Sequence, residues 1–155
     1  MPVLKHVRNT LWFDATFARL YTQQHTVFKF EVTLKLHLAN LGDTKLFTGY
    51  ADDHVIVSRE RFDTSIVVQA SEVRNDWHIA RFDDLTEADF NYFLPLQPEV
   101  VLLGTGAQQR FAHPRLYRAL TGAGIGVECM TTPAACRTYN ILAEEGRKVV
   151  AAIII

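Results

Sequence analysis

The chain has 155 residues, of which 48% are apolar and 21% charged, and its formal net charge is −1. This length and composition are typical of one globular domain and exclude a disordered, collagen-like or coiled-coil chain. The balance of charges removes the usual electrostatic argument for a nucleic-acid partner, and no apolar run approaches the ~18 residues that span a bilayer.

The amino-terminal half is expected to be rich in strands. The first 26 residues have no clear pattern, although Trp12, Phe13 and Phe17 can lie on one face of a short helix. Residues 28–38 alternate strictly between apolar and polar side chains, which predicts a strand with one buried face. The close spacing of the strands that follow favours antiparallel pairing. They are expected at residues 45–50, 54–57, 65–69 and 77–80.

The carboxyl-terminal half alternates between helices and strands. A short helix is expected from residue 85 to 90, where Thr86 and Asp89 have the spacing of a helix cap. The order then predicts strand, helix, strand, helix, strand, and two such crossovers normally leave three parallel strands in one sheet. These elements are expected at residues 99–103, 114–120, 125–130, 133–145 (with Thr132 as the cap) and 148–155. We therefore predict a single mixed α+β domain.

A glycine loop follows the first of these parallel strands, at Gly104, Thr105 and Gly106. A dinucleotide site is not expected, because Gln109 stands where the fingerprint has its third glycine and the next helix begins only at Pro114. The glycines can serve simply as a tight exit from the strand.

An anion site is the second interpretation of this loop. The glycine loop and the turn at Thr132 both leave the carboxyl ends of expected parallel strands, where ligands of open α/β sheets tend to bind. Arg110 and Arg137 can supply the charge, since guanidinium groups suit oxyanions. Arg137 can equally pair with Glu128.

No catalytic group stands out from the sequence. The six histidines have no metal-ligand spacing, and there is no nucleophile elbow. Cys129 and Cys136 are expected to be buried, reduced packing residues, and His113 before Pro114 to cap a helix. We therefore expect no catalytic residue, no metal and no cofactor. No secretory signal is recognisable, so a cytoplasmic location is expected.

Four segments together resemble a small domain family of bacteria, archaea and mitochondria. They lie at residues 82–86, 101–106, 126–128 and 134–140. The family includes the third assembly factor of mitochondrial respiratory complex I (NADH dehydrogenase ubiquinone 1 alpha subcomplex) and an adipogenesis-associated human protein. The resemblance covers residues 80–155 well and the strands from Leu34 more loosely, and most members have no established activity.

The resemblance implies a three-layer β/β/α domain with a crevice near the glycine loop, and protein assembly as one use of the fold. Family members commonly begin near Leu34. Residues 1–33 are therefore expected to be an extension that packs poorly, or sequence from a misplaced start codon, and residues 34–155 to be one globular domain.

Two functions follow from these observations. The first is a non-catalytic protein-interaction or assembly domain of a bacterial, cytoplasmic protein. The alternative is a small anionic-ligand binding protein or enzyme that uses the Gly104–Thr105–Gly106 loop, Arg110, Thr132 and Arg137. The oligomeric state is not contained in the sequence.

Overall fold

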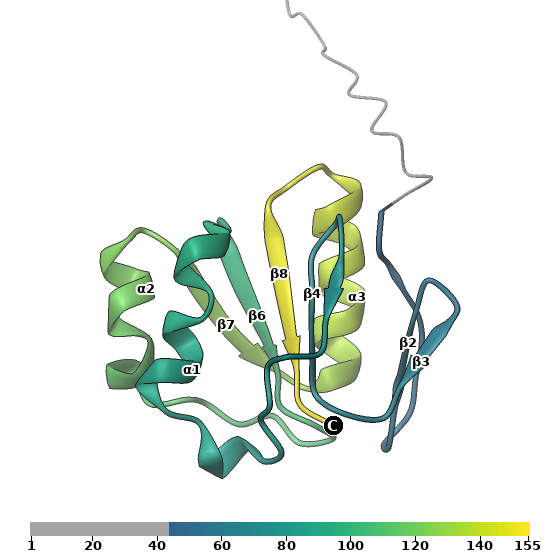
Figure 1. The fold of residues 1–155 in the computed structure, drawn as a ribbon, viewed down its shortest axis with the longest axis horizontal. Coiled ribbons are helices and arrows are strands. Elements are labelled where there is room, and N and C mark those ends of the chain that lie inside the picture. The colour runs from purple at the N-terminus through teal and green to yellow at the C-terminus, as the bar shows by residue number, and fades with distance from the viewer. Residues whose placement is uncertain (1–43) are drawn as a thin grey trace, which may run out of the picture. The chain divides into compact units, whose positions relative to one another are not determined.

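The structure is a computed structural model that describes residues 44–155 (Figure 1). The expected strand at residues 28–38 and the expected extension at residues 1–33, with Trp12, Phe13 and Phe17, lie outside the described residues.

The strands of the described residues form two sheets. The smaller sheet is antiparallel, in the order β1 (Phe47–Tyr50), β2 (Val55–Val57) and β3 (Glu60–Phe62). The larger sheet has the order β5-β4-β8-β6-β7. In it β4 is antiparallel to β5 and β8, whereas β6 is parallel to β7 and β8. Its strands are β4 (Ile66–Val68), β5 (Val73–Arg74), β6 (Val100–Gly104), β7 (Gly126–Met130) and β8 (Val149–Ile153).

Helices connect the parallel strands as the sequence predicts. Thr86 and Asp89 form a capping box at the start of α1 (Glu87–Asn91), and the ring of His113 accepts a hydrogen bond from the Arg115 amide before α2 (Arg118–Gly122). The third helix, α3 (Thr132–Glu144), joins β7 to β8. Single turns of 3₁₀ helix occur at Phe82–Asp84, Leu94–Leu96 and Pro114–Tyr117.

The central strands of the larger sheet are buried on both faces. Along β6 and β8 alternate side chains enter two different hydrophobic clusters, as the pleat of a strand requires. Val101 and Leu103 belong to the cluster that contains Phe90 of α1 and Leu120 of α2, whereas Leu102 belongs to the cluster under α3 and the small sheet. Figure 1 shows α1 and α2 on one side of the large sheet and α3 on the other.

One expected strand is wrong and two short strands are additional. Residues 77–80 form no ladder, although Trp77 and Ile79 are buried. The Trp77 indole N–H instead donates to the backbone carbonyl of Asp89 at 3.3 Å, so the alternation reflects packing against α1. The additional strands are β3 and β5, which have three and two residues. The mixed α+β class and the strand–helix–strand–helix–strand unit are confirmed.

Candidate functional site

The glycine loop and the start of α3 meet at the carboxyl ends of β6 and β7. These strands are parallel neighbours, and the chain leaves β6 toward α2 but leaves β7 toward α3 on the opposite face. The Thr132 amide donates to the carbonyl of Gly106 at 2.8 Å, so the two connections contact each other directly. The sequence predicted this meeting point, which is where open α/β sheets commonly bind ligands.

Gly104 lets α3 approach the sheet closely. A Cβ at this position would lie 2.8 Å from Cδ1 of Ile153, 3.1 Å from Oγ1 of Thr132 and 3.3 Å from Cβ of Ala135. Gly106 has a different role, because its φ of +86° is a conformation that side-chain-bearing residues rarely adopt. The two glycines therefore serve close packing and a tight turn, respectively.

Thr105 organises the loop from within. Its side chain is buried, and Oγ1 accepts a hydrogen bond from the Arg110 amide at 3.1 Å. The carbonyls of Gln108 and Met130 lie 2.8 and 3.0 Å from the same oxygen, and they share its single hydroxyl hydrogen. The Thr105 amide donates to the carbonyl of Met130 at 2.9 Å, so both the hydroxyl and the amide of this residue are used internally.

Thr132 fastens the other side of the loop. Its buried hydroxyl accepts from the Gly106 amide at 3.0 Å and donates to the carbonyl of Ile154 at 3.2 Å. Thr132 is not the helix cap that the sequence predicts. That position belongs to Thr131, whose Oγ1 accepts from the Ala134 amide at 3.4 Å, because Thr132 already lies in the first helical turn.

Arg110 is engaged beside the loop. Its guanidinium donates two hydrogen bonds to the carboxylate of Asp83, and its Cζ lies 4.2 Å from the centroid of the Phe82 ring. The hydrogen bond from Arg110 lowers the pKa of Asp83. Stacking and bidentate pairing together hold this side chain over the turn at Phe82–Asp84.

Arg137 points elsewhere. Its Nη1 donates to the hydroxyl of Tyr50 on β1 at 2.7 Å, and its Cζ lies 5.9 Å from the Tyr50 ring centroid. It does not pair with Glu128, which forms no ion pair with any residue between 44 and 155. The structure thus brings together Gly104, Thr105, Gly106 and Thr132, while each arginine has its own partner.

The space next to the loop is small. A cavity of about 20 Å³ lies against Gly106, Ala107, Thr132 and Pro133, with Asp52 also in its wall. This is room for about one water molecule, and a carboxylate in the wall disfavours an anion. Within the described residues no three histidine, cysteine, aspartate or glutamate side chains could hold a metal ion. The predicted anion site stays a prediction.

Phe111 is the feature of this loop that the sequence analysis missed. Its side chain is 76% exposed, although the neighbouring Ala112 is buried. Two residues earlier, the side-chain amide of Gln109 donates to the carbonyl of Cys129 at 3.2 Å. The available signal was a phenylalanine that is the one large apolar side chain between residues 105 and 113. The loop therefore keeps the Thr105 hydroxyl inside and presents an aromatic ring to solvent.

The two thiols are not poised for reaction. Burial raises the pKa of Cys136 to about 12, and it also raises the pKa of the half-buried Cys129. Because the thiolate is the nucleophilic form, both groups are largely protonated and inert at neutral pH. Both cysteines are free, as the sequence predicts.

Comparisons with known proteins agree with the family resemblance. A family model described as a protein of unknown function (DUF498/DUF598) matches residues 47–154. The mouse NADH dehydrogenase (ubiquinone) 1 alpha subcomplex assembly factor 3 is 41% identical over 80 residues, which cover 50% of this chain and 43% of that protein. The chain thus matches less than half the length of this curated relative.

Bacterial proteins match over a larger share of their length. The 13 kDa major membrane protein of Francisella tularensis is 27% identical over 111 residues, covering 70% of this chain and 89% of that protein. The crystal structure of a Bordetella parapertussis protein superposes with a TM-score of 0.68 and 39% identity, covering 72% of this chain and 95% of the other. Among the described residues no helix is long and apolar enough to cross a membrane.

Proposed function

Since this chain belongs to the DUF498/DUF598 family of proteins of unknown function, we propose that it is a non-catalytic protein-interaction domain that acts as an assembly factor. The similarity to assembly factor 3 of NADH dehydrogenase supports this proposal, and the match covers 50% of this chain and 43% of that protein. Its molecular function is to hold a partner protein, with no chemical step.

The observation that carries the proposal is the position of Phe111. A phenylalanine ring that is 76% exposed leaves apolar surface in water, and burying such surface gains roughly 25 cal/mol per Å². Aromatic residues are enriched in the cores of protein interfaces. The loop beneath the ring is fixed by Thr105 and Thr132, so little conformational entropy is lost when a partner covers it.

The surroundings of Phe111 suit the rim of an interface. Arg110, next in the chain, is held by Asp83 and stacked on Phe82, so its guanidinium is fixed one residue before Phe111 in the sequence. Arginine and aromatic residues are over-represented among the side chains that dominate binding energy. The same contacts weigh against the alternative of an anion-binding protein, because both Arg110 and Arg137 are occupied.

The test compares Phe111→Ala with Ile141→Ala, a matched truncation of another exposed apolar side chain, 58% accessible, on α3. Affinity-tagged chains would be recovered from cells and the bound proteins quantified by mass spectrometry. We expect a partner that is retained by the wild type and by Ile141→Ala but reduced at least about tenfold by Phe111→Ala, the size of effect that truncating an interface anchor gives.

Both variants should keep the thermal midpoint of the wild type, because neither side chain is buried. Equal recovery of every partner by the two variants would contradict the role of Phe111. Chemical-shift changes at Gly106 and Thr132 on titration with inorganic phosphate would instead favour the anion-binding alternative.

We also propose a bacterial, cytoplasmic setting and a functional unit that spans residues 34–155. The free thiols of Cys129 and Cys136 support a reducing compartment, and the family match at residues 47–154 supports this unit. Cell fractionation with an antibody against the native protein tests the location. A chain that begins at Leu34 should unfold at the temperature of the full chain.

A further inference from the structure

Strand β7 is an edge of the large sheet. It lies at the end of the strand order, and within residues 44–155 it pairs with β6 alone. All five of its residues, from Gly126 to Met130, take part in that parallel pairing. An edge strand leaves a row of backbone donors and acceptors on its outer side, which another chain can use.

The direction of the backbone groups identifies which of them face outward. The Gly126 amide donates to the carbonyl of Glu99 and the Met130 carbonyl accepts from Thr105, so these two residues face β6. Because a parallel ladder alternates along the strand, the backbone groups of Val127 and Cys129 point away from β6. Gln109 reaches the Cys129 carbonyl from this outer side at 3.2 Å.

The side-chain amide of Gln109 therefore donates to Cys129 where a backbone N–H of a neighbouring strand would otherwise donate. Its side chain is exposed and can be replaced by an arriving N–H group. No described residue bonds the outer amide and carbonyl of Val127 or the outer amide of Cys129. These three backbone groups of β7 are available to a partner. The carbonyl of Cys129 becomes a fourth when the side chain of Gln109 moves away.

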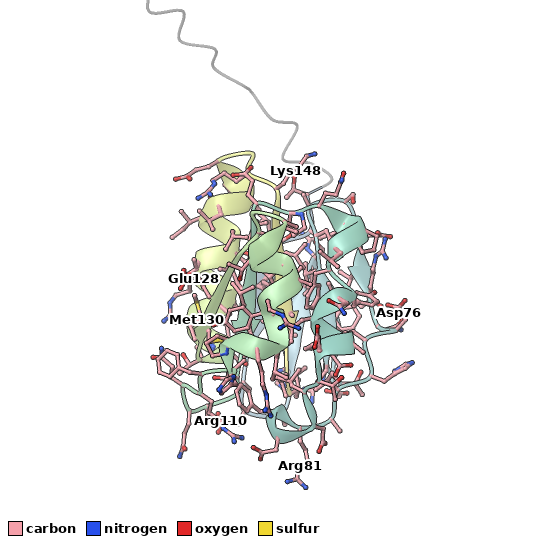
Figure 2. The ribbon with its side chains drawn as sticks, turned by 90° about the vertical axis from the view of Figure 1, so that its left-hand side faces the viewer. Asp76, Arg81, Arg110, Glu128, Met130 and Lys148 are labelled. Carbon is pink, nitrogen blue, oxygen red and sulfur yellow. The ribbon has the colours of Figure 1, made fainter. Side chains whose placement is uncertain are left out.

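Glu128 is the charged side chain at the centre of this edge. It is exposed and makes no ion pair within the described residues. Figure 2 labels Glu128 and Met130 next to each other along β7, above Arg110. Met130 packs against the cluster under α3, whereas Val127 and Cys129 pack on the other face, so Glu128 stands on the α3 face of the edge.

This charge argues against a second copy as the occupant. Two β7 strands that pair antiparallel over their full length place Val127 opposite Cys129 and Glu128 opposite Glu128. Like charges directly opposite each other destabilise a strand pair, and charges on edges are a common device against edge-to-edge association. The same carboxylate favours a strand that carries a basic residue at the facing position.

We propose that the β7 edge binds an extended segment of another protein, which adds a strand antiparallel to β7 and places a lysine or arginine opposite Glu128. The backbone of Val127 and Cys129 supplies the hydrogen bonds, and the facing charge selects the partner. The inference rests on the proposed function for the existence of a protein partner, but it concerns β7 and not the ring of Phe111.

The experiment uses the chain itself as the basic strand. Isotope-labelled wild-type protein is titrated with unlabelled chains that carry Glu128→Lys, and the titration is repeated with unlabelled wild type. We expect amide shifts centred on Val127 and Cys129 with the variant, and an affinity about tenfold higher than between wild-type chains. The difference should shrink as salt is raised, since exposed charges are screened.

Two control variants make the result decisive. Val127→Pro in the unlabelled Glu128→Lys chain removes an outward amide of the edge, where proline is tolerated by the fold, and should abolish the shifts. Phe111→Ala in both chains should leave these amide shifts unchanged. The titration therefore tests strand addition at β7 independently of the proposed interface at Phe111.

The proposal is overturned if the Glu128→Lys chains bind no more tightly than wild type does. It is equally overturned if Val127→Pro binds as well, or if the shifts map to a surface other than β7.

Discussion

The side-chain amide of Asn140 on α3 pairs with both backbone groups of Phe47 at the start of β1. Its Oδ1 accepts from the Phe47 amide at 2.9 Å, and its Nδ2 donates to the Phe47 carbonyl at 2.8 Å. The side chain thus takes the place of a neighbouring strand at this position, and it ties the small sheet to the helix. The Phe47 ring packs edge-on against Tyr139, at 5.4 Å between ring centroids, and reinforces the connection.

Replacing Asn140 should loosen the small sheet. Asn140→Ala leaves a partly buried amide and carbonyl without their partner, which costs about 1–3 kcal/mol of unfolding free energy. Asn140→Asp keeps the acceptor but sets a carboxylate against the Phe47 carbonyl. Urea denaturation of the two variants is the measurement, and a wild-type midpoint for both would show that the pairing contributes nothing.

Gly104→Ala should destabilise the fold by overpacking. The added methyl group would lie 2.8 Å from Cδ1 of Ile153, a fully buried side chain, and such insertions cost about 1–3 kcal/mol. The double variant Gly104→Ala/Ile153→Val lacks that Cδ1 and should recover part of the loss relative to Ile153→Val alone. If the two losses simply add, steric conflict at Ile153 is not the cause.

Alkaline pH should destabilise the protein through Cys136. Burial raises the pKa of this thiol to about 12 in the folded state, whereas an exposed thiol titrates near ~8.5. Between these values the unfolded chain loses a proton that the folded chain keeps, so stability is intact below about pH 8.5 and declines as pH rises above it. Cys136→Ala should show a shallower decline between pH 9 and 11 in thermal melts, and an unchanged slope would contradict the assignment.

Tyr139→Phe should leave stability unchanged or raise it. The Tyr139 ring is fully buried, and its hydroxyl has no hydrogen-bond partner among residues 44–155. Removing an unsatisfied hydroxyl can gain up to about 1 kcal/mol, while the ring keeps its contact with Phe47. Calorimetry provides the comparison. A clear loss of stability would mean that the hydroxyl has a partner or a function that its surroundings do not reveal.

The sequence predicted the carboxyl-terminal half well because its signals are local. The capping box of Thr86 and Asp89 and the ring of His113 act within three residues, and each marks the start of a helix. The parallel order of the last three strands followed from the two helical crossovers between them. Burial of Cys136 followed from its position on an apolar helix face, whereas Cys129, which was also expected to be buried, is only half-buried.

What the sequence could not predict depends on contacts between distant segments. Arg137 binds Tyr50, 87 residues earlier in the chain, and no local pattern distinguishes that partner from Glu128. The alternation at residues 77–80 predicted a strand, but Trp77 and Ile79 are buried because they pack in the cluster around Phe93. The ring centroids of Trp77 and Phe93 lie 5.8 Å apart. The exposure of Phe111 likewise depends on the fixed path of the whole glycine loop.

Strand β8 lies between β4 and β6, although it follows both of them in the chain. While the protein is being synthesised, the two strands that will flank β8 therefore emerge from the ribosome with no strand to join them. Both keep an open edge until residues 149–153 have left the exit tunnel, which makes the nascent chain vulnerable to pairing with other chains. The central strand of the large sheet is therefore the last to be added. We expect folding to be completed only after translation of β8, and to depend until then on protection of the open strand edges from pairing with other chains.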